Sequence, residues 1–167
     1  MKNLIRGALA LLFITLSLPS QAAVRVLATT ADWGALTKEL GGDRVDVYTA
    51  TTAMQDVHRV EAKPSLVARA RTADLLVANG ADLEIGWLPV LLQESGNPKI
   101  QRGAPGYFEA ASAVQLVEIP SKLDRAMGDI HPYGNPHIQL DPRNVAAVAK
   151  ALGAKLAAID PAGAETY

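Results

Sequence analysis

Short apolar runs recur along the first half of the chain and alternate with longer amphipathic stretches. Residues 24–30, 45–51 and 74–79 are rich in β-branched and aliphatic side chains and have the length of single strands. Two stretches between them, 33–40 and 64–70, place apolar residues three or four positions apart, as one face of a helix does. The predicted order is β-α-β-α-β. This alternation predicts the α/β class, with an open parallel β-sheet flanked by helices.

Residues with special backbone roles mark the ends of the predicted helices. Asp32 is the expected N-cap of the first helix, and Gly41 and Gly42 are expected to end it. Pro64 is expected in the first turn of the second helix, where its missing N–H costs little. Near the end of the chain, Asp141 is the expected cap of a long helix whose apolar face carries Val145, Val148, Leu152, Leu156 and Ile159.

The middle of the chain is less regular. A helix is expected over residues 83–94, with Pro89 in or near its first turn. Short strands are expected near residues 99–101 and 114–118. Residues 120–135 show no period and include several glycines and prolines, which predicts a long ordered loop.

The first 22 residues have the organisation of a secretory signal peptide. Lys2 and Arg6 precede an apolar run of 11 residues, 8–18, which is too short to span a bilayer as a helix. Ser20 and Ala22 are small residues at the positions that a signal peptidase reads. We therefore expect cleavage after Ala22, export to the periplasm and no stable membrane insertion afterwards.

Composition narrows the class of protein further. There is no cysteine, which excludes disulfides, a thiolate metal site and a lipid-modified cysteine. Removing residues 1–22 takes away two basic residues and no acidic one, leaving 14 basic and 17 acidic residues and a net charge of −3. This balance does not indicate a nucleic-acid partner. The remaining length suits one domain with its own core.

Only three histidines are present, and all three fall in polar or Gly/Pro-rich segments between regular elements. His58 follows the second strand, which places it at the carboxyl edge of a parallel sheet, where ligands bind. His137 precedes the Asp141 cap, and His131 lies six residues before it. Imidazole is the commonest side-chain ligand for zinc, and Asp56 or Glu61 could orient a ring or add an oxygen ligand.

Other interpretations of these residues stay open on spacing alone. The histidines are also compatible with solvated loop positions, and His131 with packing or hydrogen bonding inside its loop. Asp141 is better explained as a helix cap than as a ligand. The aromatic residues share no period and are expected to pack in the core or under loops: Trp33, Trp87, Tyr107 and Phe108.

Four ordered segments together resemble a known family. They are DVHRVEAKPS (56–65), ADLLVANG (73–80), DLEIGWL (82–88) and NPHIQLDPRN (135–144). In order and spacing these are similar to the metal-binding solute-binding proteins of zinc and manganese ABC importers. Two features depart from that pattern: Gln139 stands where an aromatic residue is usual, and the histidine-rich loop of zinc-specific members is missing.

The resemblance implies a two-lobed architecture with the metal between the lobes. Residues 23–160 would form the amino-terminal metal-binding lobe, and residues 161–167 the start of the helix that links it to a second lobe absent from this sequence. His58 and His137 would be the first two metal ligands, and the resemblance does not assign His131, which is an accessory candidate. The partner would be the permease of an ABC importer.

Three functions remain in view from the sequence. The first is a non-enzymatic protein that binds Zn²⁺ as a transported ligand, with Mn²⁺ as the alternative metal. Imidazole ligands and the intrinsic affinity order both favour zinc. The second is a periplasmic metal-dependent hydrolase, for which no recognised catalytic spacing is present. The third is a binding protein for a small organic solute, or a lobe that binds nothing.

Overall fold

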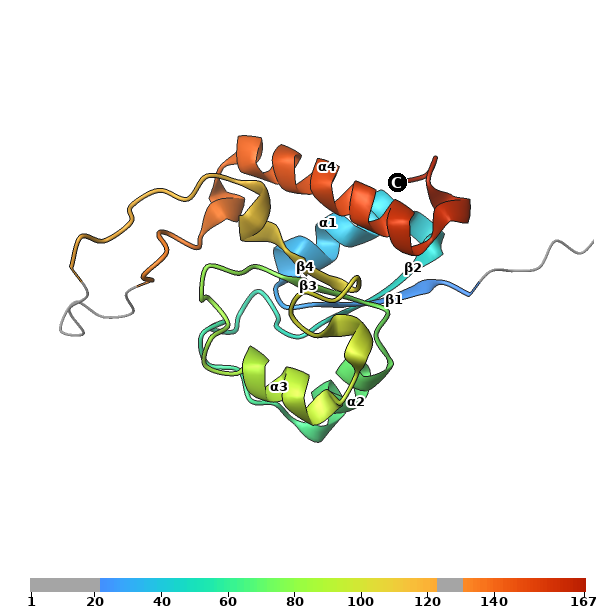
Figure 1. Cartoon of the computed structure of the whole chain (residues 1–167), viewed down its shortest axis with the longest axis horizontal. Helices are drawn as coiled ribbons and strands as arrows, with labels where there is room; N and C mark the ends of the chain where they lie inside the picture. The colour runs from blue at the N-terminus through green and yellow to red at the C-terminus, as the bar shows by residue number, and fades with distance from the viewer. Residues whose placement is uncertain (1–21, 123–130) are drawn as a thin grey trace, which may run out of the picture.

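The computed structural model describes residues 22–122 and 131–167 (Figure 1). Most of the expected signal peptide, residues 1–21, and part of the long loop, residues 123–130, lie outside this description. Within the described residues a single parallel sheet has the strand order β2-β1-β3-β4. Its strands are β1 (Val24–Ala28), β2 (Val45–Thr49), β3 (Leu75–Ala78) and β4 (Tyr107–Glu109).

Helices cover both faces of this sheet, as the alternation of elements predicted. In Figure 1, α1 (Ala31–Gly41) and α4 (Pro142–Ile159) lie on one face, and α2 (Pro64–Thr72) and α3 (Leu88–Ser95) on the other. Short 3-10 helices complete the described fold: η1 (Gly42–Arg44), η2 (Pro98–Ile100), η3 (Ala110–Ala113), η5 (Ile138–Leu140) and η6 (Pro161–Gly163).

The two-residue period of the strands divides the core between the two helical layers. On β1, Val26 and Ala28 pack in the cluster that contains α1 and α4, whereas Leu27 packs with α2 and α3. On the face of α4, Val148, Leu152 and Leu156 are fully buried. Successive strand side chains point to opposite faces, so each strand contributes to both cores. This explains why β3 is apolar at every position.

The expected helix boundaries are partly correct. Pro64 lies in the first turn of α2, and the Asp141 carboxylate caps α4 by accepting a hydrogen bond from the N–H of Arg143 at 2.8 Å. Asp32, however, is not the cap of α1. Thr30 takes the extended N-cap conformation, and Asp32 lies in the first turn. There its carboxylate still stabilises the helix by interacting with the positive end of the helix dipole.

Three expectations for the middle of the chain were wrong. Helix α3 begins at Leu88 rather than at residue 83, because Pro89 is tolerated only in a first turn and residues 81–87 form turns. Residues 98–100 form η2 instead of a strand, since Pro98 fixes the backbone and the Asn97 side chain accepts from the Lys99 N–H. Residues 114–118 form no strand; Val114 and Leu116 pack against the α1 and α4 core, whereas Val117 is exposed.

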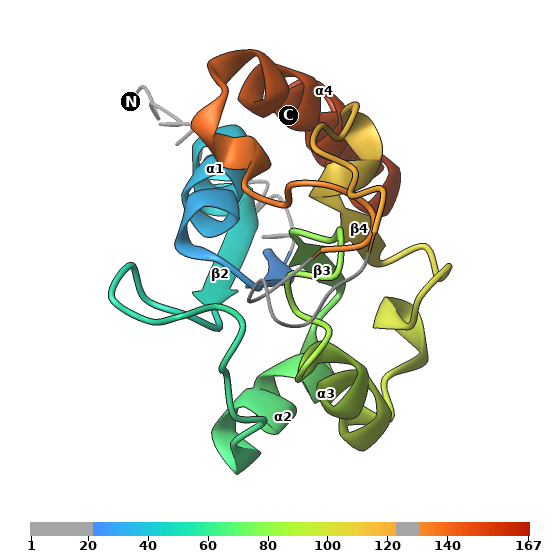
Figure 2. The ribbon, with the colours of Figure 1, turned by 90° about the vertical axis from the view of Figure 1, so that its left-hand side faces the viewer.

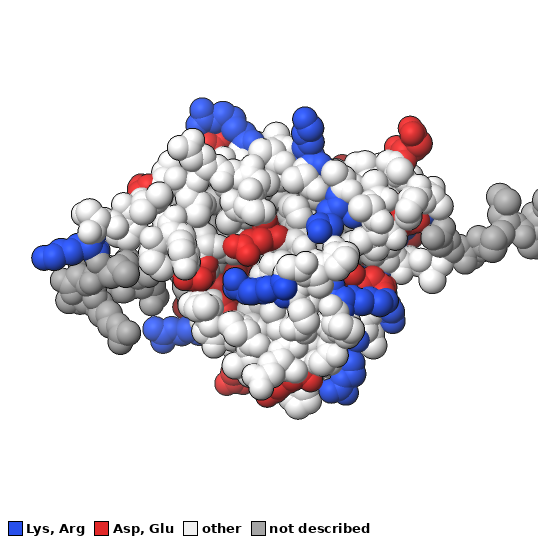
Figure 3. Space-filling model, in the orientation of Figure 1, with Lys and Arg blue, Asp and Glu red and all other residues white. Residues whose placement is uncertain are grey.

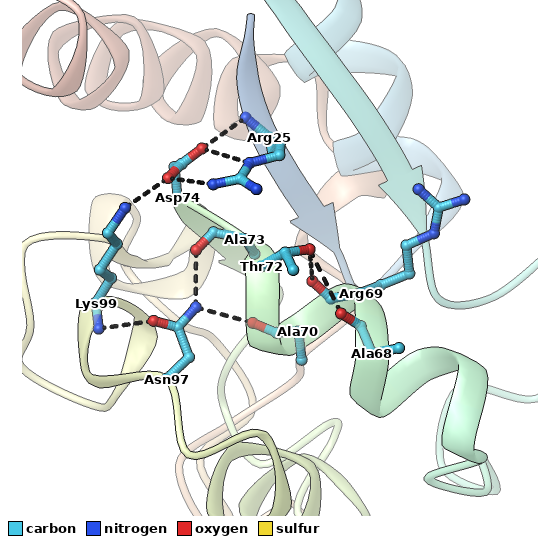
Figure 4. Close-up of polar contacts among 9 residues, drawn as sticks. All are labelled: Arg25, Ala68, Arg69, Ala70, Thr72, Ala73, Asp74, Asn97 and Lys99. Carbon is cyan, nitrogen blue, oxygen red and sulfur yellow. Dashed lines mark hydrogen bonds and ion pairs between the residues drawn. The ribbon is translucent and has the colours of Figure 1, made fainter. Parts of the chain in front are cut away.

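A charged cluster joins the strands at the amino edge of the sheet (Figure 4). Asp74 accepts hydrogen bonds from the Arg25 guanidinium at 3.0 and 3.2 Å and from Lys99 Nζ at 2.8 Å. Partial burial alone would raise the pKa of Asp74, but the hydrogen bonds from the two cations outweigh it and lower the pKa to about 2. Beside it, Asn97 donates to the carbonyls of Ala70 and Ala73 and so closes the end of α2.

The face of the molecule shown in Figure 3 carries acidic and basic side chains interspersed over both helical layers. Among the described residues drawn on that face, the basic side chains do not form a continuous stripe. Among residues 22–122 and 131–167, every helix is too short or too polar to cross a bilayer. The segment after α4 forms η6 and a turn, and its role as the start of a linking helix stays a prediction.

Candidate metal centre

All four strands are parallel, so their carboxyl ends meet at one edge of the sheet, which faces the viewer in Figure 2. The connection from β2 to α2 carries His58 along this edge. The segment that leads into η5 carries His131 and His137 to the same place. Ligand sites in open parallel sheets lie at this edge because the connecting loops converge there.

The three histidines surround one pocket. His58 Nε2 lies 3.1 Å from His131 Nε2, although the two residues are 73 positions apart in the chain. The ring centres of His58 and His131 are 5.2 Å apart, and His137 lies 6.3 and 6.5 Å from those two rings. We call the cavity between them, of about 320 Å³, the histidine pocket; it is lined by His58, Glu118, Pro120, His131, Gly134, Asn135, Pro136 and His137.

Asp56 orients the first of these rings. Its Oδ1 lies 2.8 Å from His58 Nδ1 and accepts the backbone N–H of His58 at 3.0 Å. The side-chain and backbone hydrogen bonds from His58 lower the pKa of Asp56, so it is a carboxylate near neutral pH. A carboxylate at Nδ1 favours the tautomer with the proton on Nδ1. The lone pair of Nε2 then points into the pocket, as in metal-bound histidines.

The spacing of two of the rings is close to that of zinc ligands. With Zn–N bonds of about 2.0–2.1 Å, two nitrogens of a tetrahedral site lie about 3.3–3.4 Å apart, compared with 3.1 Å between His58 and His131. Within the described ranges, no three His, Cys, Asp or Glu side chains already stand at ligand positions around one point. His137 therefore has to approach the other two rings for all three to bind one ion.

Two buried side chains hold the loops that carry His58 and His137. The indole N–H of Trp87 donates to the carbonyl of Val57 at 2.8 Å, directly before His58. The amide of Asn79 donates to the carbonyl of Pro136 at 2.9 Å, directly before His137. Asn79 directly follows β3, and Trp87 lies at the end of the turns between β3 and α3. Each donates to the main chain of one loop, so the two bonds limit how far each histidine can move.

The other candidates from the sequence are distributed as follows. Asp56 orients a ring, whereas Glu61 lines a different cavity, with Arg59 and Lys63, and is not among the residues of the histidine pocket. Asp141 caps α4, as expected. Periodicity did not mark Asn79 or Trp87 as residues of the site, although both lie in the segments that carried the family resemblance. For Asn79 the available signal was its position at the end of the third strand.

A family profile described as zinc-uptake complex component A, periplasmic, matches residues 26–167. The chain belongs to this family. The match covers both histidine-bearing loops and all the described helices and strands except the first two residues of β1, so the family resemblance expected from the four sequence segments is confirmed.

Two similar proteins are described as substrate-binding lipoproteins for different metals. The manganese ABC transporter substrate-binding lipoprotein PsaA of Streptococcus mitis is 28% identical over 147 residues, which cover 86% of this chain and 44% of that protein. The iron ABC transporter substrate-binding lipoprotein MtsA of Streptococcus pyogenes serotype M1 is 26% identical over 99% of this chain and 53% of that protein. The chain thus spans about half the length of these relatives.

Solved structures confirm the fold. Zn(II)-bound AdcA from Streptococcus pneumoniae superposes with a TM-score of 0.67 at 23% identity, over 87% of this chain and 28% of that chain. A zinc-bound ZnuA carrying a deletion of residues 138–173 superposes with a TM-score of 0.69 at 24% identity, over 87% of this chain and 50% of that chain. The α/β architecture with a flanked parallel sheet is therefore that of one part of these larger proteins.

Proposed function

We propose that this chain captures a divalent metal ion, with zinc as the favoured cargo, for delivery to the permease of an ABC importer. The single observation that carries the proposal is the convergence of His58, His131 and His137 on one pocket, with His58 oriented by a carboxylate. The family membership and the substrate-binding relatives support it. The proposal includes export after loss of residues 1–22 and action in the periplasm.

The ligand chemistry supports zinc over manganese. The pocket offers three imidazoles, whereas Mn²⁺ prefers carboxylate, carbonyl and water oxygens. At mixed nitrogen and oxygen sites the intrinsic order of affinity also places Zn²⁺ above Mn²⁺. Three protein ligands leave a fourth tetrahedral position, which water or a group from a second lobe would fill. We propose that residues 23–160 act as one lobe of a two-lobed site, by analogy with relatives about twice as long.

Titration of the purified mature chain with Zn²⁺ and Mn²⁺ tests this proposal. We expect saturable binding of one Zn²⁺ per chain in calorimetry, and weaker binding of Mn²⁺ under the same conditions. Protons compete with the ion for the imidazole lone pairs, so zinc affinity should be lower in acidic than in neutral buffer. Failure of either ion to bind saturably would refute a metal-binding role for the pocket.

Replacement of His131 by alanine is expected to weaken zinc binding about tenfold, or about 1.4 kcal/mol. Its Nε2 lies within the pocket beside His58 Nε2, but Pro132 restricts the backbone of residue 131 to extended conformations and limits its adjustment to the ion. The measurement is a competition titration against a chromophoric chelator. Unchanged zinc affinity would return His131 to a packing role, and a loss equal to that of His137→Ala would make it a primary ligand.

A further inference from the structure

A turn-rich stretch between β3 and α3 contacts both the loop that carries His58 and the loop that carries His137. We call residues 79–87 the anchoring segment. Its backbone has positive φ at three successive residues, Gly80 (86°), Ala81 (51°) and Asp82 (62°). Positive φ is uncommon for residues other than glycine and persists only where the surrounding structure holds it. Such a conformation needs contacts that compensate for the strain.

The side chain of Glu84 supplies those contacts from inside the segment. Only 2% of Glu84 is exposed, and its carboxyl accepts hydrogen bonds from Thr29 Oγ1 and from the backbone N–H groups of Asn79 (2.7 Å) and Gly80 (3.1 Å). Burial raises the pKa of Glu84, and these hydrogen bonds oppose that shift. The segment is thereby joined to the ends of both β1 and β3, the two central strands of the sheet.

The two ends of the anchoring segment each hold one histidine-bearing loop. Asn79 donates to the Pro136 carbonyl, and its own amide is oriented because its Oδ1 accepts the indole N–H of Trp33 at 2.9 Å. Trp87 donates to the Val57 carbonyl. Between them, Gly86 packs so closely that a Cβ there would stand 3.3 Å from the carbonyl oxygen of His58.

We infer that the anchoring segment sets the metal affinity of the histidine pocket without supplying a ligand, with Trp87 as the positioning residue for His58 and Asn79 as that for His137. This inference rests on the proposed function, in which His58 and His137 bind the ion. A single strained turn fixes the main chain beside both ligand histidines. The loss of conformational entropy needed to bring the two histidines together therefore occurs on folding rather than on metal binding. Residues that orient metal ligands typically change affinity 10–100-fold when removed.

Two substitutions in the mature chain test this role. Trp87→Phe removes the indole N–H and keeps the buried ring, and Asn79→Ala removes the amide. Each is expected to weaken Zn²⁺ binding about tenfold in chelator competition. Cobalt(II), used in place of zinc, should show an altered visible absorption spectrum in both variants, because that spectrum reports the arrangement of the ligands rather than the stability of the fold.

Asn97→Ala is the matched control. Asn97 is also buried and also donates through Nδ2 to two main-chain carbonyls, but it lies at the opposite edge of the sheet (Figure 4). The Asn97→Ala substitution should lower the melting temperature much as Asn79→Ala does, and should leave zinc affinity and the cobalt spectrum unchanged. Equal loss of affinity in Asn97→Ala and Asn79→Ala would overturn the inference. Unchanged zinc affinity in Trp87→Phe, together with loss of binding in His58→Ala, would also overturn the inference. Absence of zinc binding by the unaltered chain would instead overturn the proposed function.

Discussion

Replacement of either His58 or His137 by alanine is expected to lower zinc affinity at least ~100-fold, about 2.7 kcal/mol. His58 has the stronger structural case, because the Asp56 carboxylate directs its Nε2 lone pair into the pocket before any ion arrives. His137 comes from a different loop that Asn79 holds at the Pro136 carbonyl. Loss of either imidazole leaves two ligands, and half of the tetrahedron would then fall to water.

The measurement is zinc titration of each variant beside Glu61→Ala as a control. Glu61 comes from the same loop as His58 and was a candidate ligand in the sequence, but it lines the cavity with Arg59 and Lys63 instead. Glu61→Ala should bind zinc like the unaltered chain. Circular dichroism should show the same apo fold in all variants. Undiminished zinc binding in both histidine variants would place the metal somewhere other than the histidine pocket.

Asp74→Asn is expected to lower the free energy of unfolding by about 2 kcal/mol near neutral pH. A folded pKa of about 2 against an ordinary value of 3.8 means that the carboxylate form is favoured in the native state. The physical cause is the pairing with Arg25 and Lys99 at the amino edge of the sheet (Figure 4). The Asp74 side chain is 21% exposed, but those of Arg25 and Lys99 are 51% and 61% exposed, so solvent screening keeps the contribution below what the pKa shift alone implies.

The pH dependence follows from the direction of that shift. The contribution of Asp74 is complete above its unfolded pKa and is lost as the pH falls through its folded pKa, so the difference between the two proteins should shrink from pH 5 towards pH 2. Urea unfolding of both proteins across that range measures it. Asp46→Asn, at an exposed carboxylate on neighbouring β2, is the control and should change stability little. A difference that stays constant down to pH 2 would show that the charge of Asp74 is not the cause.

Neither prediction depends on the other, because they concern opposite edges of the sheet. The amino edge carries the charged cluster around Asp74, where Figure 4 shows cations from β1 and from η2 meeting one carboxylate. The carboxyl edge carries the histidine pocket. Asp74→Asn should therefore change stability without changing zinc affinity, and the histidine variants should do the reverse.

Local patterns along the chain were sufficient for the fold class and for most elements. The two-residue period of strands and the spacing of Val148, Leu152 and Leu156 depend only on which side chains face a core, so the sequence determined β1, β2, β3 and α4 to within a few residues. Two of the wrong expectations, the early start of α3 and the strand near residues 114–118, share one cause. Leu83 is buried in a turn, and Val114 and Leu116 are half-buried in an irregular segment; burial alone does not distinguish such positions from those of a helix or a strand.

The three histidines could be chosen from the sequence because no others exist and all lie between regular elements. Their arrangement in space could not be predicted from the sequence. The 3.1 Å approach of His58 to His131 joins positions 73 residues apart and depends on how two loops cross the carboxyl edge of the sheet. Likewise, Asn79 and Trp87 are connected to the histidine-bearing loops by hydrogen bonds to the carbonyls of Pro136 and Val57, and these contacts are visible only in the structure. Hydrophobic period is a local property of the chain, whereas these contacts are set by long-range packing, which only the tertiary structure decides.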